Sequence, residues 1–412
     1  MYTSDVFITG IGLITPLGMG KEETWNNMLK GASGVKQISR FDASALPVKI
    51  AGELSNDIEY VSRGYFKRKT LCRTMIRFSK IAITAACLAI EDARIDVGKK
   101  SREETARIGV CIGTGMGGLL HGEERPMRCD GDLVSAVKVS AASAASPIAA
   151  HFNINGPSLT VTTACASGGH AIGVAYDLIK MDRIDMAVAG GVETAICPEA
   201  ILGLNALGVL SRRNDQPRKA SRPFDKDRDG FVLSEGAGMV IIESRRHLEM
   251  RGGAPYCRIR GWASNSEICV TANPIETGYG MAEVMNLVLN SAHLEKSDIE
   301  YINAHGTSTK TNDICETRAI KMVFGQLAPG IPISSTKSML GHTIGASAAI
   351  EVAVCALSIY HGKIHPTVNL EAPDPECDLD YVPNRPVPRR IRAALSNSFG
   401  LAGNNCCIAL SH

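Results

Sequence analysis

The sequence of 412 residues lacks several features that mark whole classes of protein. Its N-terminus has neither the basic stretch nor the apolar core of a signal peptide, and no apolar run reaches the ~20 residues that cross a bilayer. The net charge is only +2, so the composition gives no support for general nucleic-acid binding. These absences indicate an ordinary soluble globular protein with neither a membrane nor a nucleic-acid partner.

Paired cysteine motifs are also missing. The thirteen cysteines are scattered, their number is odd, and none belongs to a Cys-x-x-Cys pair. Without a signal peptide or zinc-ligand spacing, this pattern predicts reduced thiols in a cytoplasmic protein that holds no metal. Most of these cysteines are expected to be small core residues.

The chain shows a repeated alternation of apolar strands and helical patterns. Strands are predicted at 6–10, 108–112, 158–161, 186–189, 299–302, 331–334 and 393–396, and helices at 78–92, 171–179, 281–293 and 346–360. Alternating strands and helices predict an α/β protein whose sheets are mostly parallel and covered by helices.

The alternation restarts beyond about residue 255. In both stretches a strand leads into a turn rich in glycine, serine and threonine, and then into a helix, which hints at an internal duplication. No flexible linker separates the two stretches. We therefore expect two halves, residues 1–254 and residues 255–412.

Two short motifs look like ligand sites but depart from them. Gly113–Gly118 has the spacing of a dinucleotide fingerprint, yet no acidic residue ends a second strand about 20 residues later. Asp225–Gly230 matches the opening of a calcium loop, but Gly236 stands where the bidentate Glu belongs. We interpret the first motif as a close crossing of backbone and the second as a salt-bridged turn.

Cys165 stands out among the thirteen thiols because of its local context. A β-branched run at 161–163 leads toward it, small residues follow, and 171–179 has a helical pattern. That order predicts a strand, a tight elbow and a helix, which places the sulfur at a helix N-terminus where the dipole favours a thiolate. A nucleophile on such an elbow is typical of acyl transfer.

Two histidine motifs supply candidate partners for this thiol. His305 follows a predicted strand and His342 lies at a predicted helix start, both among glycine and hydroxyl residues. Lys337 lies five residues before His342. Glu316 and Asp313 follow His305 along the chain. A cysteine with two histidines and a lysine suggests an acyl thioester and then a carbanion, because neutral imidazoles can hydrogen-bond an enolate oxygen.

Motifs that share one family order extend over nearly the whole chain. Together they resemble the β-ketoacyl-[acyl-carrier-protein] synthase I/II family of the thiolase superfamily, which includes ketosynthase subunits of type II polyketide synthases. The matching stretches are 7–12, 161–168, 221–225 with 228–232, 235–238, 303–309, 336–342 and 396–400.

The resemblance implies a thiolase-like, five-layered αβαβα core of two duplicated halves, usually in a dimer. It implies Cys165 as the acyl acceptor, with His305 and His342 supporting decarboxylation of a malonyl thioester. Lys337 would organise the two histidines, with Glu316 and Asp313 in the supporting network. No metal or redox cofactor is implied.

The resemblance also assigns roles to the surroundings of the thiol. The backbone N–H groups of Cys165 and Phe399 would form the oxyanion hole, and Phe399 would gate the acyl pocket. Thr307 and Thr309 would hydrogen-bond the pantetheine arm. Met116 matches a family position that limits acyl-chain depth near the dimer interface.

The implied reaction is that of a 3-oxoacyl-[acyl-carrier-protein] synthase. A Cys-bound acyl chain is extended by two carbons through decarboxylative Claisen condensation with malonyl carrier protein. Because carrier protein is acidic, a basic docking face is expected. The candidates are Lys67–Lys69 with Arg73 and Arg77, and Arg212–Arg213 with Arg218–Lys219.

Three stretches depart from the family pattern. Leu401 and Ala402 stand where the family loop reads Phe-Gly, 265–274 differs from the usual Asp-Ala-His-His-Met-Thr, and 137–146 has unusually small residues. The implied catalytic residues are all present, while the residues around them differ from the family pattern. This combination suits a specialised enzyme, such as the ketosynthase subunit of a type II polyketide or polyene system paired with a chain-length factor.

Several alternatives stay open at this point. Fatty-acid elongation competes with a secondary-metabolite pathway, and a homodimer competes with a heterodimer. A non-catalytic partner subunit is disfavoured because the cysteine, both histidines and the lysine are all present. Cys406–Cys407 near the C-terminus prompt a thiolase interpretation, but the motif around Phe399 points away from it.

Overall fold

A computed structural model describes residues 5–55, 57–58, 62–66, 75–118, 140–267 and 277–412. Its main feature is an eleven-stranded mixed sheet in the order β11-β10-β14-β15-β9-β1-β8-β7-β5-β6, with β2 paired to β1. Two-stranded sheets are formed by β3 (Lys36–Gln37) with β4 (Ile50–Ala51) and by β12 (Lys363–Ile364) with β13 (Val387–Pro388).

The strands of the main sheet fall into two sets with the same connectivity. In each set the first strand pairs with the last, and the order then continues outward through three further strands to an edge of the sheet. The first set is β1 (Val6–Thr15), β5 (Ile108–Gly113), β6 (Ser158–Val161), β7 (Met186–Glu193) and β8 (Gly236–Ser244), with the short β2 (Gly18–Met19). The second is β9 (Cys257–Ser266), β10 (Ile299–Asn303), β11 (Ile333–Ser334), β14 (Ala393–Phe399) and β15 (Asn404–Ser411).

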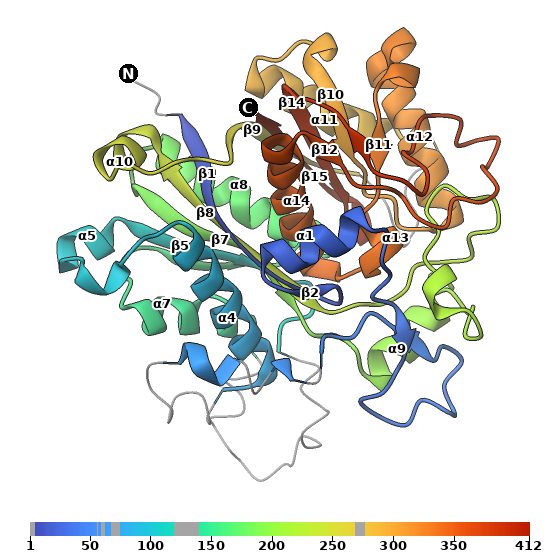
Figure 1. Cartoon of the computed structure of the whole chain (residues 1–412), viewed down its shortest axis with the longest axis horizontal. Coiled ribbons are helices and arrows are strands. Elements are labelled where there is room, and N and C mark those ends of the chain that lie inside the picture. Colours follow the sequence, from blue (N-terminus) through green and yellow to red (C-terminus); the bar gives the residue numbers. More distant parts are fainter. Residues whose placement is uncertain (1–4, 56, 59–61, 67–74, 119–139, 268–276) are drawn as a thin grey trace.

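Helices cover both faces of the two strand sets, which gives the five layers expected of a thiolase-like fold (Figure 1). α4 packs outside the first set, α11 and α12 lie outside the second, and α8 and α14 fill the layer between them. The α-helices are α1 (Lys21–Leu29), α4 (Arg77–Asp92), α5 (Arg102–Ala106), α7 (Ser146–Phe152), α8 (Ser167–Lys180), α9 (Pro198–Ala206), α10 (Arg245–Met250), α11 (Tyr279–Ala292), α12 (Lys310–Phe324), α13 (Lys337–Leu340) and α14 (Ser347–His361).

The main sheet is mixed, but the prediction that most of its strand pairs are parallel is wrong. In the main sheet the parallel pairs are β5–β6, β5–β7, β10–β11 and β10–β14. The antiparallel pairs, which are more numerous, are β1–β2, β1–β8, β1–β9, β7–β8, β14–β15 and β9–β15. The missed strands β8, β9 and β15 account for this, because antiparallel neighbours need no helical crossover and so escape a search for strand–helix alternation.

The predicted elements that follow the alternation are confirmed. Residues 158–161 are β6 as predicted, and the four predicted helices correspond to α4, α8, α11 and α14. The largest strand error is β1, which continues to Thr15 instead of ending at residue 10, and β11 begins at Ile333 instead of residue 331. The apolar stretch Ile344–His361 is long enough to cross a membrane, but 89% of it is buried inside the protein, as in a core helix.

The two ligand-like motifs have structural roles. A Cβ on Gly113 would lie 2.2 Å from the carbonyl carbon of Ser167, so the glycine permits a close crossing of β5 and the start of α8. The Asp225 carboxylate accepts hydrogen bonds from the backbone N–H groups of Asp227, Glu371 and Ala372 and pairs with Arg222 at 3.0 Å. Both interpretations made from the sequence are confirmed.

Candidate active site

Cys165 lies on a tight turn between β6 and α8, in the layer shared by the two halves. Ala164 has a φ of +50°, a left-handed conformation that non-glycine residues adopt only when held there. Ser167 holds the turn: its Oγ accepts from the Thr163 N–H at 2.9 Å and donates to the Ala164 carbonyl at 2.6 Å. The predicted strand, elbow and helix are therefore present, with Cys165 only 3% exposed.

The sulfur of Cys165 is more protonated than its position at a helix start suggests. Burial raises the pKa of the thiol to about 11, and the Leu401 N–H and the charge of Lys337 oppose this shift without reversing it. The expected thiolate is thus not the resting form, because desolvation outweighs the stabilising groups around the sulfur.

This raised pKa predicts how Cys165 reacts with an alkylating agent. Since only the thiolate reacts, the rate of iodoacetamide alkylation should keep rising about tenfold per pH unit between pH 7 and pH 10. Intact-mass measurements on the wild type and Cys165→Ala would isolate this site from the other thiols. A rate that levels off near pH 8.5, where an ordinary thiol titrates, would contradict the prediction.

His305 is held by its backbone and by one ring nitrogen. It lies two residues beyond β10, and Glu316 accepts hydrogen bonds from the N–H groups of His305 at 2.9 Å and Gly306 at 2.8 Å. The Lys337 Nζ lies 3.3 Å from His305 Nδ1. Burial, then the charge of Lys337 and the repulsion that would arise if His342 were also protonated, hold the pKa of His305 well below its usual value, so the ring is neutral.

His342 lies in the turn between α13 and α14, beside the segment 231–235. Its N–H donates to the Val232 carbonyl at 2.7 Å, and its ring nitrogen Nε2 lies 3.1 Å from the Cys165 sulfur. The Ile344 N–H donates to His342 Nδ1 at 3.2 Å. Burial, with the charge of Lys337, lowers the pKa of His342 well below its usual value, so this ring is also neutral.

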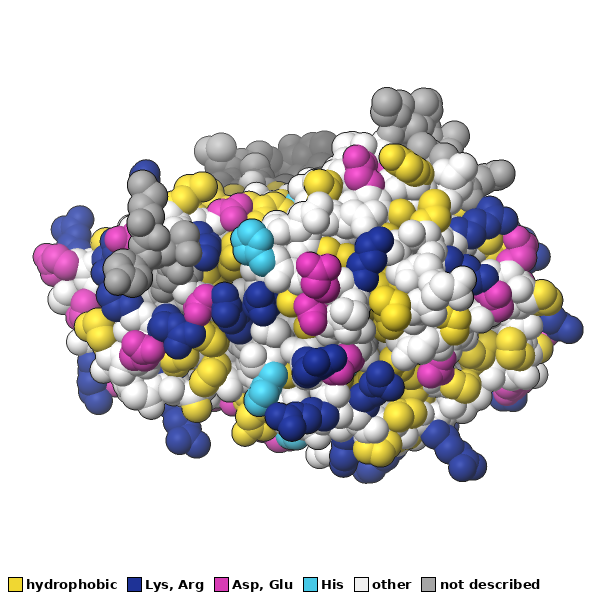
Figure 2. Space-filling model, turned by 90° about the horizontal axis from the view of Figure 1, so that it is seen from above, with side chains coloured by type: hydrophobic (Ala, Val, Ile, Leu, Met, Phe, Trp, Pro, Cys, Tyr) yellow, Lys and Arg dark blue, Asp and Glu magenta, His cyan; other side chains and the backbone are white. Residues whose placement is uncertain are grey.

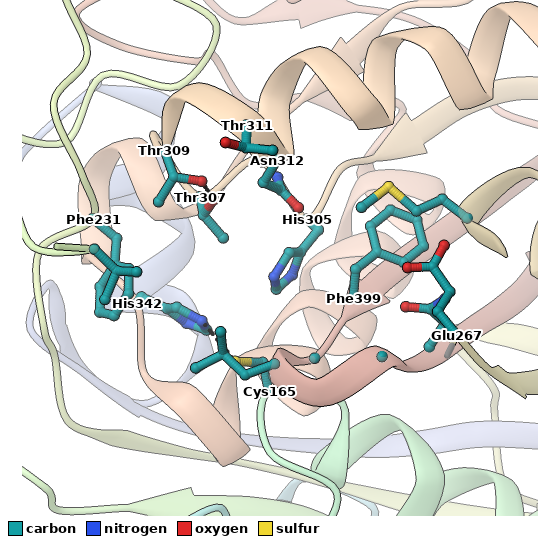
Figure 3. Close-up of a pocket in the computed structure, with 16 residues that line it drawn as sticks. Cys165, Phe231, Glu267, His305, Thr307, Thr309, Thr311, Asn312, His342 and Phe399 are labelled. Carbon is teal, nitrogen blue, oxygen red and sulfur yellow. Dashed lines mark hydrogen bonds between the residues drawn. The ribbon is translucent and has the colours of Figure 1, made fainter. Parts of the chain in front are cut away.

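The hydrogen bonds at both Nδ1 atoms determine where the imidazole protons are. A neutral ring whose Nδ1 accepts carries its proton on Nε2, so both rings present an N–H donor. The two ring centroids are 5.5 Å apart, and Figure 3 shows both rings facing the space above Cys165. The thiol and imidazole atoms lie within 4.8 Å of one another, a cluster of metal-ligating types. It does not suit a metal, because Nε2–H offers no lone pair.

Lys337 is neutralised by Glu351, which the sequence reasoning missed. The Lys337 Nζ donates to Glu351 Oε1, and both side chains are almost fully buried. Glu316 instead anchors the backbone of His305, while Asp313 accepts from the Phe224 N–H at 2.9 Å and lies 3.5 Å from Arg228. The signal for Glu351 was available as the one carboxylate in the apolar helix 347–361.

Replacing Glu351 by Ala is expected to destabilise the protein by about 3–5 kcal/mol, because it leaves the Lys337 ammonium buried without a counter-ion. Chemical denaturation of Glu351→Ala and Glu351→Gln would measure the loss, which should be smaller for Gln. Glu371→Ala is the matched control, since Glu371 pairs with Lys219 at the surface and is worth about 0–1 kcal/mol. Equal losses for Glu351→Ala and Glu371→Ala would contradict the prediction.

A cavity of about 70 Å³ joins these groups (Figure 3). Phe399, which is 5% exposed, lines it with its ring centroid 5.8 Å from that of His305. Thr307 and Thr309 line it as well, and their hydroxyl oxygens are 2.9 Å apart. The cavity lining thus brings together six of the predicted residues, namely Cys165, His305, Thr307, Thr309, His342 and Phe399.

Met116 is placed apart from that cavity lining. Its N–H approaches the carboxylate of Glu193, a second buried acid that the sequence reasoning missed. Glu193 also accepts from the N–H groups of Gly115 at 2.7 Å and Gly345 at 3.1 Å. Burial raises the pKa of Glu193 to about 7 against these hydrogen bonds. Glu193 therefore ties the segment carrying Met116 to the turn that follows His342.

The structure describes only part of the three stretches that depart from the family pattern and of the two basic clusters. Leu401 lines the cavity, whereas residues 268–274, 137–139, Lys67–Lys69 and Arg73 lie outside the described part of the chain. Arg77 is half-buried and its guanidinium is paired with Glu235, so it offers little docking surface. Basic and acidic side chains are interspersed on the face in Figure 2. In the second cluster Arg212, Arg218 and Lys219 are exposed.

Comparison with known proteins identifies the family. Residues 3–247 match the model of the β-ketoacyl synthase N-terminal domain, and residues 256–371 match that of the C-terminal domain. The chain belongs to the β-ketoacyl synthase family. As a β-ketoacyl synthase it is an acyltransferase-type condensing enzyme.

Two β-ketoacyl synthases with assigned names are similar along nearly their whole length. The 3-oxoacyl-[acyl-carrier-protein] synthase 2 of Synechocystis sp. is 39% identical, and the alignment covers 98% of this chain and 97% of the relative. The protein of the same name from Coxiella burnetii is 38% identical, with 98% of each chain covered.

Solved structures of ketosynthases superpose closely on this chain. A type II polyketide ketosynthase in complex with its acyl-carrier protein has a TM-score of 0.89 at 33% identity, covering 99% of both chains. The ishigamide ketosynthase/chain length factor has a TM-score of 0.90 at 32% identity, again covering 99% of both. The thiolase-like fold predicted from the motifs is confirmed by these neighbours.

Proposed function

We propose that this β-ketoacyl synthase is a 3-oxoacyl-[acyl-carrier-protein] synthase that joins a Cys165-bound acyl group to the enolate of a malonyl thioester. One observation supports it most strongly. Two neutral imidazoles, each with its proton on Nε2, face the sulfur of the nucleophile in one buried cavity. Such a pair suits stabilisation of an enolate oxygen better than it suits hydrolysis, which needs a basic nitrogen beside the thiol.

In the first half-reaction Cys165 exchanges its proton for an acyl group. Its sulfur attacks the carbonyl carbon of an acyl carrier thioester, the carbon–sulfur bond to pantetheine breaks, and the proton ends on the pantetheine thiol. The N–H groups of Cys165 and Phe399 would stabilise the tetrahedral oxyanion. Their proximity is supported by Gly400, where an added Cβ would lie 3.5 Å from the Cys165 nitrogen.

In the second half-reaction a malonyl thioester loses its carboxylate as carbon dioxide. The electron pair of the broken carbon–carbon bond forms an enolate, whose oxygen accepts hydrogen bonds from Nε2–H of His305 and His342. The enolate carbon then attacks the acyl carbonyl, and the Cys165 sulfur leaves and regains a proton. Lys337 keeps the His305 proton on Nε2, and Glu316 with Asp313 holds the backbone around it.

The remaining predicted residues would handle the substrate arms. Thr307 and Thr309 lie on the cavity wall where a pantetheine amide can reach their hydroxyl groups. The Phe399 ring packs beside the His305 ring and lines the cavity, a position suited to a gate. Met116 would limit the depth of the acyl chain from outside the described cavity lining.

Two partners are proposed, a second ketosynthase chain and acyl carrier protein, from exposed residues and from the relatives. Among the described residues β6 is the last strand in the sheet order, and Leu159 on it is 40% exposed, so this edge suits pairing with a second ketosynthase chain. We propose docking of acyl carrier protein at the cluster around Arg212 and Lys219, because the nearby Val209 lines the cavity. We also propose a cytoplasmic location and a boundary between the halves at 254/255. The ten described cysteines are buried, as small core residues are.

The test is reconstitution with purified acyl carrier protein loaded with acyl and malonyl groups. Formation of 3-oxoacyl carrier protein together with one carbon dioxide per product would support the proposal. Decarboxylation without a condensed product, or no acylation of Cys165 by any acyl thioester, would refute it.

A polyketide or polyene pathway is the second candidate. It is supported by the neighbours, one described as a type II polyketide ketosynthase and one as a ketosynthase/chain length factor. Co-purification with a ketosynthase-like chain that lacks the cysteine would distinguish a heterodimeric polyketide enzyme from a homodimeric fatty-acid enzyme.

A further inference from the structure

A buried carboxylate outside the cavity lining lies where three segments of the chain meet. Glu193 ends β7 and is fully buried. Its Oε2 accepts hydrogen bonds from the N–H groups of Gly115 at 2.7 Å and Gly345 at 3.1 Å. Gly115 belongs to the segment that follows β5, and Gly345 belongs to the turn that follows His342. One carboxylate oxygen thus joins the segment after β5 to the turn after His342.

The turn after His342 contains a strained residue. Ile344 has a φ of +43°, which a β-branched residue adopts only where other contacts hold it. Its N–H donates to His342 Nδ1 at 3.2 Å, and the Ser347 hydroxyl lies 2.9 Å from the same nitrogen. A backbone N–H can only donate, whereas a hydroxyl can donate or accept. The direction of the Ile344 N–H therefore decides which ring nitrogen of His342 carries the proton.

Glu193 gives this strained turn a directional contact with another element. A Cβ on Gly345 would lie 2.2 Å from the Gly115 nitrogen, and a Cβ on Gly191 would lie 2.7 Å from the Gly345 carbonyl oxygen. These close crossings limit the room for the turn without fixing the direction of its N–H groups. The hydrogen bond from the Gly345 N–H to Glu193 fixes that direction, because it holds the peptide plane that directly follows the one at Ile344.

We propose that Glu193 is a positioning residue that holds the turn at Ile344 and thereby keeps the proton of His342 on Nε2, where decarboxylation needs a donor. The inference rests on the proposed function, because it assumes that His342 donates to the enolate oxygen of a malonyl thioester. Without the contact from Gly345 the strained turn relaxes, the His342 proton can move to Nδ1, and Nε2 can then accept from the Cys165 thiol. Glu193 acts through His342 and touches no reacting atom.

The first measurement compares the two half-reactions of the full-length protein at pH 7. The rate of carbon dioxide release from malonyl carrier protein is divided by the rate of Cys165 acylation, so partial loss of active enzyme cancels. Glu193→Ala should lower this ratio by about tenfold or more, because it leaves buried N–H groups without an acceptor and frees the turn. Glu193→Gln should keep the ratio within about threefold of the wild type, because its amide oxygen can accept from both Gly115 and Gly345.

The second measurement follows the proton of His342 without any malonyl substrate. A basic Nε2 beside the sulfur stabilises the thiolate through a thiolate–imidazolium pair. Iodoacetamide alkylation of Cys165 in Glu193→Ala should therefore level off at or below about pH 9, while the wild type and Glu193→Gln keep rising about tenfold per pH unit to pH 10. Only the shapes of the pH profiles are compared, so altered access to the sulfur cancels. Since Gln also removes the charge of Glu193, it separates positioning from charge.

Glu53→Ala is the matched control for removing a buried carboxylate. Glu53 is 1% exposed and likewise accepts from backbone N–H groups, those of Ser39 at 3.1 Å and Arg40 at 3.2 Å, but it does not line the cavity. This variant should keep the wild-type ratio and pH profile. If Glu193→Ala does not fold, Glu193→Asp takes its place, because the shorter side chain cannot reach both N–H groups and should lower the ratio as Ala does.

A ratio of half-reactions unchanged in Glu193→Ala, or lowered equally in Glu193→Gln, would overturn the positioning role while leaving the proposed function intact. An alkylation profile of Glu193→Ala that matches the wild type would overturn it as well. Absence of both carbon dioxide release and Cys165 acylation in the wild type would instead refute the proposed function.

Discussion

Replacing Cys165 by Ala is expected to abolish acylation by acyl carrier thioesters and, with it, all condensation. The cavity lining within the described chain contains no other thiol, and the Nε2–H groups of His305 and His342 are donors that cannot attack a carbonyl. Intact-mass analysis after incubation with acyl carrier protein should show the adduct on the wild type and not on Cys165→Ala.

Cys406→Ala is the matched control for this result. Cys406 lies on β15 near the C-terminus, is buried and does not line the cavity. The Cys406→Ala variant should keep both acylation of Cys165 and condensation, and retained condensation would exclude a thiolase-type catalytic role for Cys406. A stable acyl adduct on Cys165→Ala, or loss of condensation in Cys406→Ala without loss of folding, would show that the nucleophile has been misassigned.

Removing either imidazole should separate the two half-reactions. In His305→Ala and in His342→Ala, decarboxylation of malonyl carrier protein should fall by roughly 10²–10³-fold, the usual cost of losing one preorganised donor to an oxyanion. Acylation of Cys165 should fall much less, because we propose that the backbone N–H groups of Cys165 and Phe399 serve that step. Release of labelled carbon dioxide and the mass of the acyl enzyme measure the two steps independently.

His361→Ala controls for the general effect of removing an imidazole. His361 ends α14 at the surface, and the variant should keep both half-reactions. Equal losses of decarboxylation and acylation in the His305 and His342 variants would contradict the division of labour. An effect confined to His342→Ala would instead indicate that the contact of Nε2 with the Cys165 sulfur, at 3.1 Å, is the essential one.

Local sequence patterns predicted the elements that surround the nucleophile. β6, the elbow at Cys165 and α8 follow from a β-branched run, small residues and a helical stripe, because each signal lies within about a dozen neighbouring residues. The strands β8 and β9 were missed because they are paired antiparallel with strands distant in the sequence, and the pairing that identifies them is not local. β15 pairs with the adjacent β14 and was missed because no helix separates the two strands.

The sequence by itself determined the chemical groups: one thiol on an elbow, two histidines after strand ends, a lysine and the motif around Phe399. Only the tertiary structure decided their states. It buries the Cys165 sulfur so that its pKa rises to about 11, places Lys337 against Glu351, and puts a hydrogen-bond donor at Nδ1 of each imidazole. Protonation states depend on desolvation and on neighbours from other elements, and these exist only once the two halves are packed around α8 and α14.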